Sequence, residues 1–219
     1  MNVGLISDVH ANEPALRAVL ADMPPVDVIV HAGDAVGYGP HPNAVLSLFD
    51  RHDVVSIRGN HDRGLEAPGE FQRRYVPVAV ESLRWTIDAL DADARAMLAA
   101  MPLERRLFDG RVHVAHGAPR APDEYVHPGD MTADLLGEAS VLVLGHTHQQ
   151  VARGFADGVI VNPGSVGQPR NGDRAAAYAV YDLAADTIEL AHVEYDPTPV
   201  VEDIEATDLP NTLADRFRS

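Results

Sequence analysis

Apolar, β-branched runs that each end on a polar motif dominate the first part of the chain and constrain its fold class. The runs cover residues 3–7, 26–31 and 54–58, and amphipathic stretches at residues 14–21 and 42–49 separate them. Strands that alternate with helices favour a largely parallel sheet with right-handed crossovers. Because the carboxyl ends of parallel strands share one edge, the polar motifs that follow the strands are predicted to meet there.

The second half of the chain has a different pattern, which favours strands from Leu103 onward. Asp109-Gly110 separates two such runs, and this dipeptide favours a two-residue type I′ hairpin turn. Residues 66–101 carry apolar side chains at helical spacing and are interpreted as a helical insertion, and residues 197–219 as a peripheral segment. No linker divides the chain, so we predict one α/β domain over residues 1–219.

The composition excludes several classes of site and partner. The chain has 219 residues, 17 Lys+Arg against 33 Asp+Glu, and no cysteine, which excludes disulfides, thiolate nucleophiles and cysteine-ligated zinc. Its formal charge of −16 opposes stable binding to nucleic acid or to an anionic membrane. No apolar stretch approaches the ~20 residues of a membrane span, and the N-terminus lacks the features of a signal peptide. We therefore expect a cytoplasmic location.

Five polar motifs at predicted strand ends form a candidate ligand set. They are Asp8-Val9-His10, Gly33-Asp34, Gly59-Asn60-His61-Asp62, His116-Gly117 and Gly145-His146-Thr147-His148. Each motif alone is weak, because such pairs also occur in helix caps and ordinary turns. Together they offer carboxylate and amide oxygens with imidazole nitrogens, a donor set that suits Mn²⁺, Fe, Zn²⁺ or Co²⁺. The absence of thiolates fits a hydrolytic site better than a structural zinc site.

The order and spacing of the motifs resemble the calcineurin-like metallophosphoesterase family, in its small single-domain bacterial and archaeal branch. The resemblance extends from Asp8 to about Arg170 and implies a four-layer α/β/β/α sandwich of two mixed sheets. It implies two metal ions at the sheet edge, the first held by Asp8, His10, Asp34 and His148. Asp34 would bridge to the second ion, held also by Asn60, His116 and His146. His61 would contact the substrate and protonate the leaving oxygen.

The residue types support this chemistry on physical grounds. Two dications about 3.5–4 Å apart need an anionic bridge, and Asp34 at the end of a central strand can provide one. A hydroxide shared by the metals has a lowered pKa and is placed to attack phosphorus. A departing alkoxide needs a proton, so an unligated histidine such as His61 is useful as general acid. An extended backbone at residues 146–148 would point both of its imidazoles to one side.

The segment after Gly33-Asp34 departs from the family pattern and narrows the substrate class. Protein phosphatases and diadenosine tetraphosphatases of the family have an Asp-Arg pair there, whereas this chain continues Ala35-Val36-Gly37-Tyr38-Gly39. The arginine that clamps the substrate in that branch is therefore missing. Tyr38 and His41 suit stacking on a base, or shielding a diester, better than gripping a dianionic monoester.

Asn12 and Arg170 are further candidates for substrate contact. A helix N-cap ahead of Pro14 is an equally good interpretation of Asn12. Arg170 ends the loop of residues 162–170, which is expected to close one side of the site, and pairing with a surface acid is the alternative for this arginine. His31 lies on the strand that leads to Asp34, and we interpret it as a packed residue that supports the ligands rather than as a ligand itself.

The sequence thus predicts a dinuclear metal-dependent phosphoesterase that hydrolyses a small phosphodiester or nucleotide substrate. Mn²⁺ is the expected metal, with Fe, Zn, Ni or Co as alternatives. A phosphomonoesterase or a nucleotide pyrophosphatase on the same site is the alternative activity. A non-catalytic interaction scaffold of the same fold is a third reading, but scaffolds usually lose ligands and every motif position is filled here. Apolar strands in the second half lead us to expect a homodimer.

Overall fold

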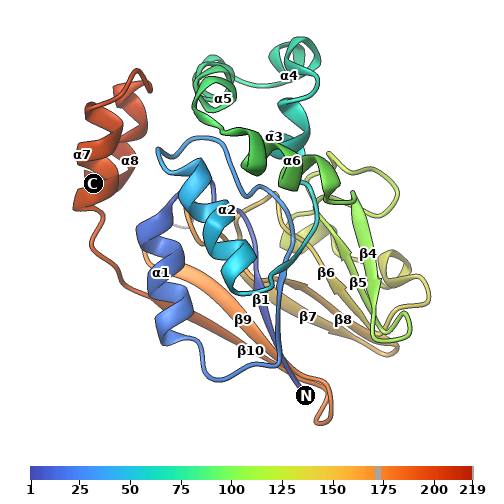
Figure 1. Ribbon diagram of the computed structural model, residues 1–219. Helices are drawn as coiled ribbons and strands as arrows, with labels where there is room; N and C mark the ends of the chain where they lie inside the picture. Colours follow the sequence, from blue (N-terminus) through green and yellow to red (C-terminus); the bar gives the residue numbers. More distant parts are fainter. Residues whose placement is uncertain (171–173, 219) are drawn as a thin grey trace.

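The computed structural model describes residues 1–170 and 174–218 and shows two five-stranded mixed sheets with helices around them (Figure 1). The first sheet has the order β10-β9-β1-β2-β3. Its strands are β1 (Asn2–Ile6), β2 (Val28–His31), β3 (Val55–Ser56), β9 (Ala176–Asp182) and β10 (Thr187–Val193). The first three strands are parallel, and β9 pairs antiparallel with both β1 and β10.

The second sheet has the order β4-β5-β6-β8-β7. Its strands are β4 (Glu104–Leu107), β5 (Val112–Ala115), β6 (Val141–Val143), β7 (Val151–Phe155) and β8 (Gly158–Asn162). Three parallel strands, β5, β6 and β8, form its centre, and antiparallel strands lie at both edges. The predicted β4–β5 hairpin is present, but its connection is residues 108–111 and thus longer than two residues.

A layer of buried, mostly aliphatic side chains joins the two sheets. Alternate residues of the central strands point into this layer, as the period of two in a strand requires. From the first sheet come Val3, Leu5, Val30, Ala179 and Tyr181, and from the second Val112, Val114, Val141, Val143 and Val161. All of them are at most 1% exposed, so we call this set the intersheet layer.

Helices α1 (Glu13–Asp22) and α2 (Pro42–Arg51) cover the outer face of the first sheet, together with α6 (Ala92–Ala100). Asn12 caps α1 and Pro14 stands in its first turn, so this helix begins where the sequence favours a start. The outer face of the second sheet is covered by the 3₁₀ helix η2 (Ala133–Leu136), together with Val126 and Met131, which flank a second short 3₁₀ helix, η1 (Pro128–Asp130). The predicted α/β/β/α sandwich is therefore confirmed, with a fourth layer of short helices.

The remaining helices gather beside the end of the molecule at which β1 and β2 terminate (Figure 1). They are α3 (Asn60–Gly64), α4 (Pro68–Arg74), α5 (Pro77–Ala89), α7 (Thr198–Glu205), η3 (Asn211–Leu213) and α8 (Asp215–Arg218). Phe71, Leu83, Ile204 and Phe217 belong to one apolar cluster, which joins the C-terminal helices to α4 and α5. No helix in the described ranges is both long enough and apolar enough to cross a membrane.

Candidate metal centre

Backbone hydrogen bonds bring the segments that follow the central strands together at one edge of the sandwich. The Asp8 amide donates to Gly33 O at 2.9 Å, and the His10 amide donates to Asp34 O at 3.0 Å, so the segments after β1 and β2 are tied together. The Gly145 amide donates to His116 O at 2.9 Å and ties the segments after β5 and β6 in the same way. The His146 amide donates to Asp8 Oδ2 at 3.1 Å and links the two sets of segments, so the two sheets place their polar motifs together.

Five of the seven predicted ligands have a left-handed backbone. The φ angles are +52° at Asp8, +48° at His10, +60° at Asp34, +65° at His146 and +59° at His148. This region is disfavoured for residues other than glycine and costs about 1–3 kcal/mol each. Such strain persists only where the surrounding structure imposes it, and it is concentrated here on the residues that carry the donor atoms.

The donor atoms of these residues converge in overlapping groups. Asp8, His10 and His148 form one group whose ligand atoms all lie within 4.8 Å of one another, and Asp34, His116 and His146 form another. Asp34 also groups with His10 and His61, so its carboxylate lies between the two sets. Asn60 joins the second set, because its Oδ1 lies 3.1 Å from His116 Nε2. The structure therefore brings all seven predicted ligands together.

Three of the imidazoles are oriented by main-chain carbonyls. The Nδ1 atoms of His10, His116 and His148 lie 3.2 Å, 2.8 Å and 2.5 Å from the carbonyl oxygens of Val36, Ala32 and Gln168, respectively. An Nδ1–H that donates to a carbonyl leaves Nε2 as the coordinating atom, the arrangement common among metal-bound histidines. In each case Nε2 faces the cluster, and His10 Nε2 lies 3.2 Å from His148 Nε2.

The charges of the cluster also fit a bound cation. Burial would raise the pKa of both carboxyls, but His148 beside Asp8 and His116 beside Asp34 hold those pKa values below their ordinary range. Burial lowers the pKa of His146 to about 3, and its Nε2 is buried without a hydrogen-bond partner among the described residues. Ionised carboxylates and a neutral, unsatisfied imidazole are the forms that ligate divalent metals.

His116 is the exception, since Asp34 outweighs burial and raises the pKa of His116 to about 9. Its Nε2 lies 3.4 Å from Asp34 Oδ2, so a proton there forms an ion pair while no cation is bound. A metal ion at this nitrogen has to displace that proton, and its binding is therefore linked to pH. The residues of the cluster fit divalent metal ions.

Asp62 stands in the Gly59-Asn60-His61-Asp62 motif, but the sequence analysis gave it no role. Its carboxylate accepts hydrogen bonds from the amides of Asp34 (2.9 Å), Val36 (3.1 Å) and Gly59 (2.9 Å). Burial and the nearby Asp34 carboxylate raise its pKa to about 6. Asp62 thereby fixes the backbone of the predicted ligand Asp34, and its position as the third residue of an α-helix that begins at Asn60 was the available signal.

His61 lies at the centre of an aromatic group that borders the cluster. Its ring centroid is 4.9 Å from that of His10 and 4.5 Å from that of Tyr38. Burial lowers the pKa of His61 to about 4, and its Nδ1 has no hydrogen-bond partner among the described residues. The structure places His61 next to the predicted ligands, and within the described part of the chain its Nδ1 is free to bond with a substrate.

The residues predicted to contact substrate have different surroundings. Tyr38 is 8% exposed and packs edge-on against His10. Asn12 is 1% exposed, and its amide donates to Gly167 O and Tyr195 Oη while its Oδ1 accepts from the Ala15 amide. These bonds occupy the Asn12 side chain inside the protein, so we do not propose it as a substrate contact.

Arg170 is exposed at the rim and donates to Gln168 Oε1 at 3.1 Å. His31 is fully buried, and its Nδ1 lies 2.7 Å from Ser56 Oγ. His31 is absent from the metal-binding groups found among the described residues. These positions leave Arg170 accessible to a substrate and His31 packed beneath the site.

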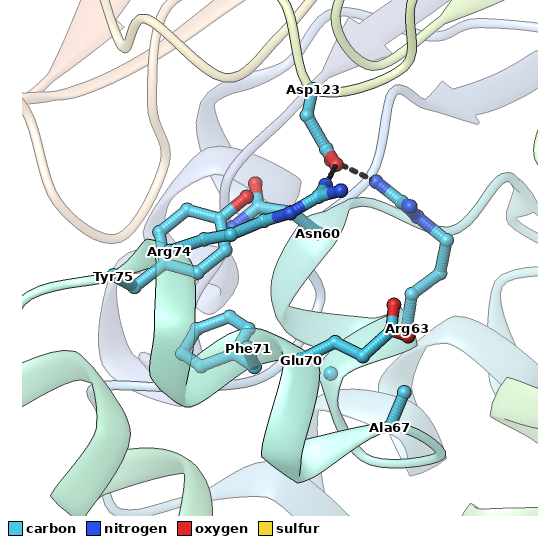
Figure 2. A pocket seen from close by; sticks show the side chains of 9 residues that line it. Asn60, Arg63, Ala67, Glu70, Phe71, Arg74, Tyr75 and Asp123 are labelled. Atoms are coloured by element: carbon cyan, nitrogen blue, oxygen red, sulfur yellow. Dashed lines mark hydrogen bonds and ion pairs between the residues drawn. The ribbon is translucent and has the colours of Figure 1, made fainter.

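Loop 118–127 supplies further residues that no sequence motif marked. Tyr125 stacks on His146 with ring centroids 3.8 Å apart and is 44% exposed. Asp123 of the same loop binds two arginines, Arg63 and Arg74, which come from α3 and α4 (Figure 2). These residues are far apart in the chain and follow no common spacing, so only the fold reveals them.

Comparisons with known proteins agree with this geometry. Residues 1–186 match the calcineurin-like phosphoesterase superfamily domain. A solved metallophosphoesterase from Sphaerobacter thermophilus is 32% identical, with a TM-score of 0.85 and coverage of 100% of this chain and 99% of its own.

Curated relatives include a probable metallophosphoesterase from Methanothermobacter thermautotrophicus, which is 30% identical over 78% of this chain and 80% of its own length. Phosphodiesterase YfcE from Escherichia coli is 26% identical over 83% of this chain and 88% of its own length. The family match covers most of the chain and includes all seven predicted ligands. The chain therefore belongs to the calcineurin-like phosphoesterase superfamily, and this family and its named relatives indicate a metal-dependent phosphoester hydrolase.

Proposed function

We propose that the protein is a dinuclear metal-dependent phosphodiesterase. The observation that carries this proposal is the position of Asp34, whose carboxylate belongs to donor groups on both sides. One ion would be held by Asp8, His10, Asp34 and His148, and the second by Asp34, Asn60, His116 and His146. Bound there, divalent ions would lower the pKa of a water nucleophile and neutralise the phosphate oxygens. Mn²⁺ is the first candidate, since O and N donors without thiolate suit it.

The chain's own residues prepare the site for a phosphodiester. Left-handed backbone at five ligands and the hydrogen bonds of Asp62 fix the donor atoms before substrate arrives. Tyr38 packs against the rings of His10 and His61, which holds the His61 imidazole in one orientation. Preorganised ligands of this kind lower the cost of reaching the transition state.

His61 is proposed to donate a proton to the leaving oxygen. With a pKa of about 4, its imidazole is neutral near pH 7 while the site holds no substrate. The negative charge of a bound phosphodiester would raise that pKa, as a nearby opposite charge does, which favours the protonated form that a general acid requires. His61→Asn should therefore reduce hydrolysis of an ester with a poor leaving group more than that of a p-nitrophenyl ester.

A diester is proposed over a monoester for two reasons. The arginine that follows the Gly-Asp motif in other branches is absent, and this segment instead carries Tyr38, which packs against His10 and His61. The name of the E. coli relative, phosphodiesterase, points to the same class.

The test compares bis(p-nitrophenyl) phosphate with p-nitrophenyl phosphate after metal removal and Mn²⁺ addition. We expect Mn²⁺-dependent hydrolysis, a higher kcat/KM for the diester, and two Mn²⁺ ions per chain by elemental analysis. Asp34→Asn should abolish activity, whereas Asp53→Asn should not. Asp53 is a matched control, because it is also an aspartate with left-handed backbone, at φ +49°, but is exposed.

A higher kcat/KM for the monoester would favour the phosphomonoesterase alternative, and preferential cleavage of a nucleoside diphosphate would favour a pyrophosphatase. Metal-independent hydrolysis, or full activity in Asp34→Asn, would reject the proposed site. We further propose a homodimer in the cytoplasm. Leu190 on the edge strand β10 is 37% exposed, and sedimentation equilibrium would measure the oligomeric state.

A further inference from the structure

A small cavity of about 60 Å³ lies beside the metal centre, between α3, α4 and loop 118–127. Its wall includes Asn60, a predicted metal ligand, together with Arg63, Arg74, Tyr75 and Asp123 (Figure 2). We call this cavity the Asn60 pocket. A group bound in it would be adjacent to a phosphodiester held at the metal centre, because Asn60 belongs to both.

Two arginines in the Asn60 pocket bind the same carboxylate. Arg74 Nη1 lies 2.7 Å from Asp123 Oδ2, and Arg63 Nη2 donates to Asp123 Oδ1. Figure 2 shows the two guanidinium groups approaching Asp123 from different sides. Each guanidinium has five N–H donors, and one carboxylate cannot satisfy them all. Arg63 Nε is in fact buried without a hydrogen-bond partner among the described residues.

The Asp123 carboxylate is not fixed rigidly between the two arginines. Asp123 lies on a loop with no helix or strand of its own, and its side chain is 27% exposed. The side chains of Arg63 and Arg74 are 24% and 62% exposed, so an anion from solvent can reach both. Two guanidinium groups match a phosphate monoester dianion in charge and in fork geometry better than they match one carboxylate.

We propose that Arg63 and Arg74 bind a second phosphate group of the substrate, beyond the diester at the metal centre, and that Asp123 occupies its place when no substrate is bound. This inference rests on the proposed phosphodiesterase function and narrows its substrate class. The preferred substrate is then a phosphodiester that carries a further phosphate on one of its substituents. The alternative is that the three residues form an ordinary ion pair that ties loop 118–127 to α3 and α4.

Two p-nitrophenyl esters that differ by one phosphate test the inference. They are thymidine 5′-(p-nitrophenyl phosphate) and the same compound with a 3′-phosphate, both assayed with Mn²⁺. The readout is the ratio of kcat/KM for the 3′-phosphorylated ester to that for the unphosphorylated ester. In the wild type we expect this ratio to exceed one, mainly through a lower KM.

Substitution of Arg74 and substitution of Asp123 should change this kcat/KM ratio in opposite directions. Arg74→Gln should lower the ratio about tenfold, the size of a lost hydrogen bond between charged groups. Asp123→Asn should raise it, because the substituted side chain no longer competes as an anion. If the ion pair only holds loop 118–127 to α3 and α4, both substitutions should change the kcat/KM ratio in the same direction. Arg73→Gln is the matched control, since Arg73 precedes Arg74 in α4 but is 71% exposed and lies outside the pocket.

Calorimetric binding of thymidine 3′,5′-bisphosphate and thymidine 5′-phosphate to the Mn²⁺-loaded protein separates this inference from the proposed function. Tighter, Arg74-dependent binding of the bisphosphate without hydrolysis of either ester would reject the function and retain the second anion site. Hydrolysis with equal ratios in the wild type, Arg74→Gln and Asp123→Asn would reject the second site and retain the function. An equal decrease of the kcat/KM ratio in Arg74→Gln and Asp123→Asn would also overturn the proposed second phosphate site.

Discussion

The intersheet layer and the metal centre are built on the same strands but follow opposite physical rules. In β1, Val3 and Leu5 are fully buried between the sheets in regular strand geometry. Three residues beyond Leu5, Asp8 is equally buried but charged and has a left-handed backbone. Burying charge and strain destabilises a fold, whereas burying apolar surface stabilises it. The layer therefore provides the stability that offsets the cost of the site.

The largest expected effect lies at the metal centre. Asp34→Ala removes the carboxylate shared by both donor groups and should lower kcat/KM for bis(p-nitrophenyl) phosphate about 10³-fold or more, since each metal contributes several kcal/mol to transition-state stabilisation. Circular dichroism should show that the metal-free variant stays folded. Loss of the fold itself would show that the two regions are not separable.

Leu5→Ala should instead lower the stability of the fold and leave the activity nearly unchanged. Leu5 is 0% exposed in the intersheet layer, and removing its side chain should lower the free energy of unfolding by about 3 kcal/mol. Urea titration measures this change. The kcat/KM of the folded fraction should stay within about twofold of the wild type, because Leu5 belongs to the intersheet layer and not to the predicted ligands. A large loss of activity at urea concentrations below the unfolding transition would contradict this separation of the intersheet layer from the metal centre.

Removal of the metal should destabilise the protein only through the site. At a metal concentration about 100 times Kd, bound ion stabilises by about 2.7 kcal/mol, which corresponds to roughly 5–10 °C in Tm for a chain of this size. Chelation should lower the Tm of the wild type and of Leu5→Ala by similar amounts and leave that of Asp34→Ala unchanged. The metal-free protein should also bind bis(p-nitrophenyl) phosphate poorly, since no divalent ions would then neutralise its phosphate oxygens.

Asp62→Ala should weaken the site through the backbone of Asp34. Loss of an outer partner of a metal ligand typically costs about 10–100-fold in metal affinity or activity. The Mn²⁺ concentration for half-maximal activity should rise, and Asp62→Asn, which keeps one acceptor oxygen, should recover part of the loss. A variant with unchanged Mn²⁺ dependence would show that Asp62 does not position the ligands.

The smallest effect concerns His31, which lies beneath the site on β2. Burial lowers its pKa to about 3 from an ordinary value of 6.5, so the unfolded chain binds more protons than the folded one between these values. The stability that this linkage provides is complete above pH 6.5 and is lost as the pH falls toward 3. Between pH 7 and 5.5 the loss from His31 alone should be about 1 kcal/mol. Urea titrations of His31→Gln should show a decrease smaller by that amount.

Much of the fold and the candidate ligand set could be predicted because both are local properties of the chain. The strands of β-branched residues that precede Asp8, Asp34 and His116 can be recognised from composition and periodicity. The roles at the edge of the site were harder to predict. The sequence favours a helix cap and a substrate contact equally for Asn12. The structure shows that its side chain forms hydrogen bonds with Ala15, Gly167 and Tyr195 inside the protein.

The sequence by itself determined which residue types follow each strand, and with them the sandwich, the family and the donor atoms. The tertiary structure alone decided that Asp62 supports Asp34, that Tyr125 covers His146, and that Asp123 binds Arg63 and Arg74. The physical reason is distance along the chain: periodicity and motif spacing act over a few residues, whereas these contacts join segments up to about 60 residues apart. Such contacts depend on how the two sheets and loop 118–127 pack, which no local pattern encodes.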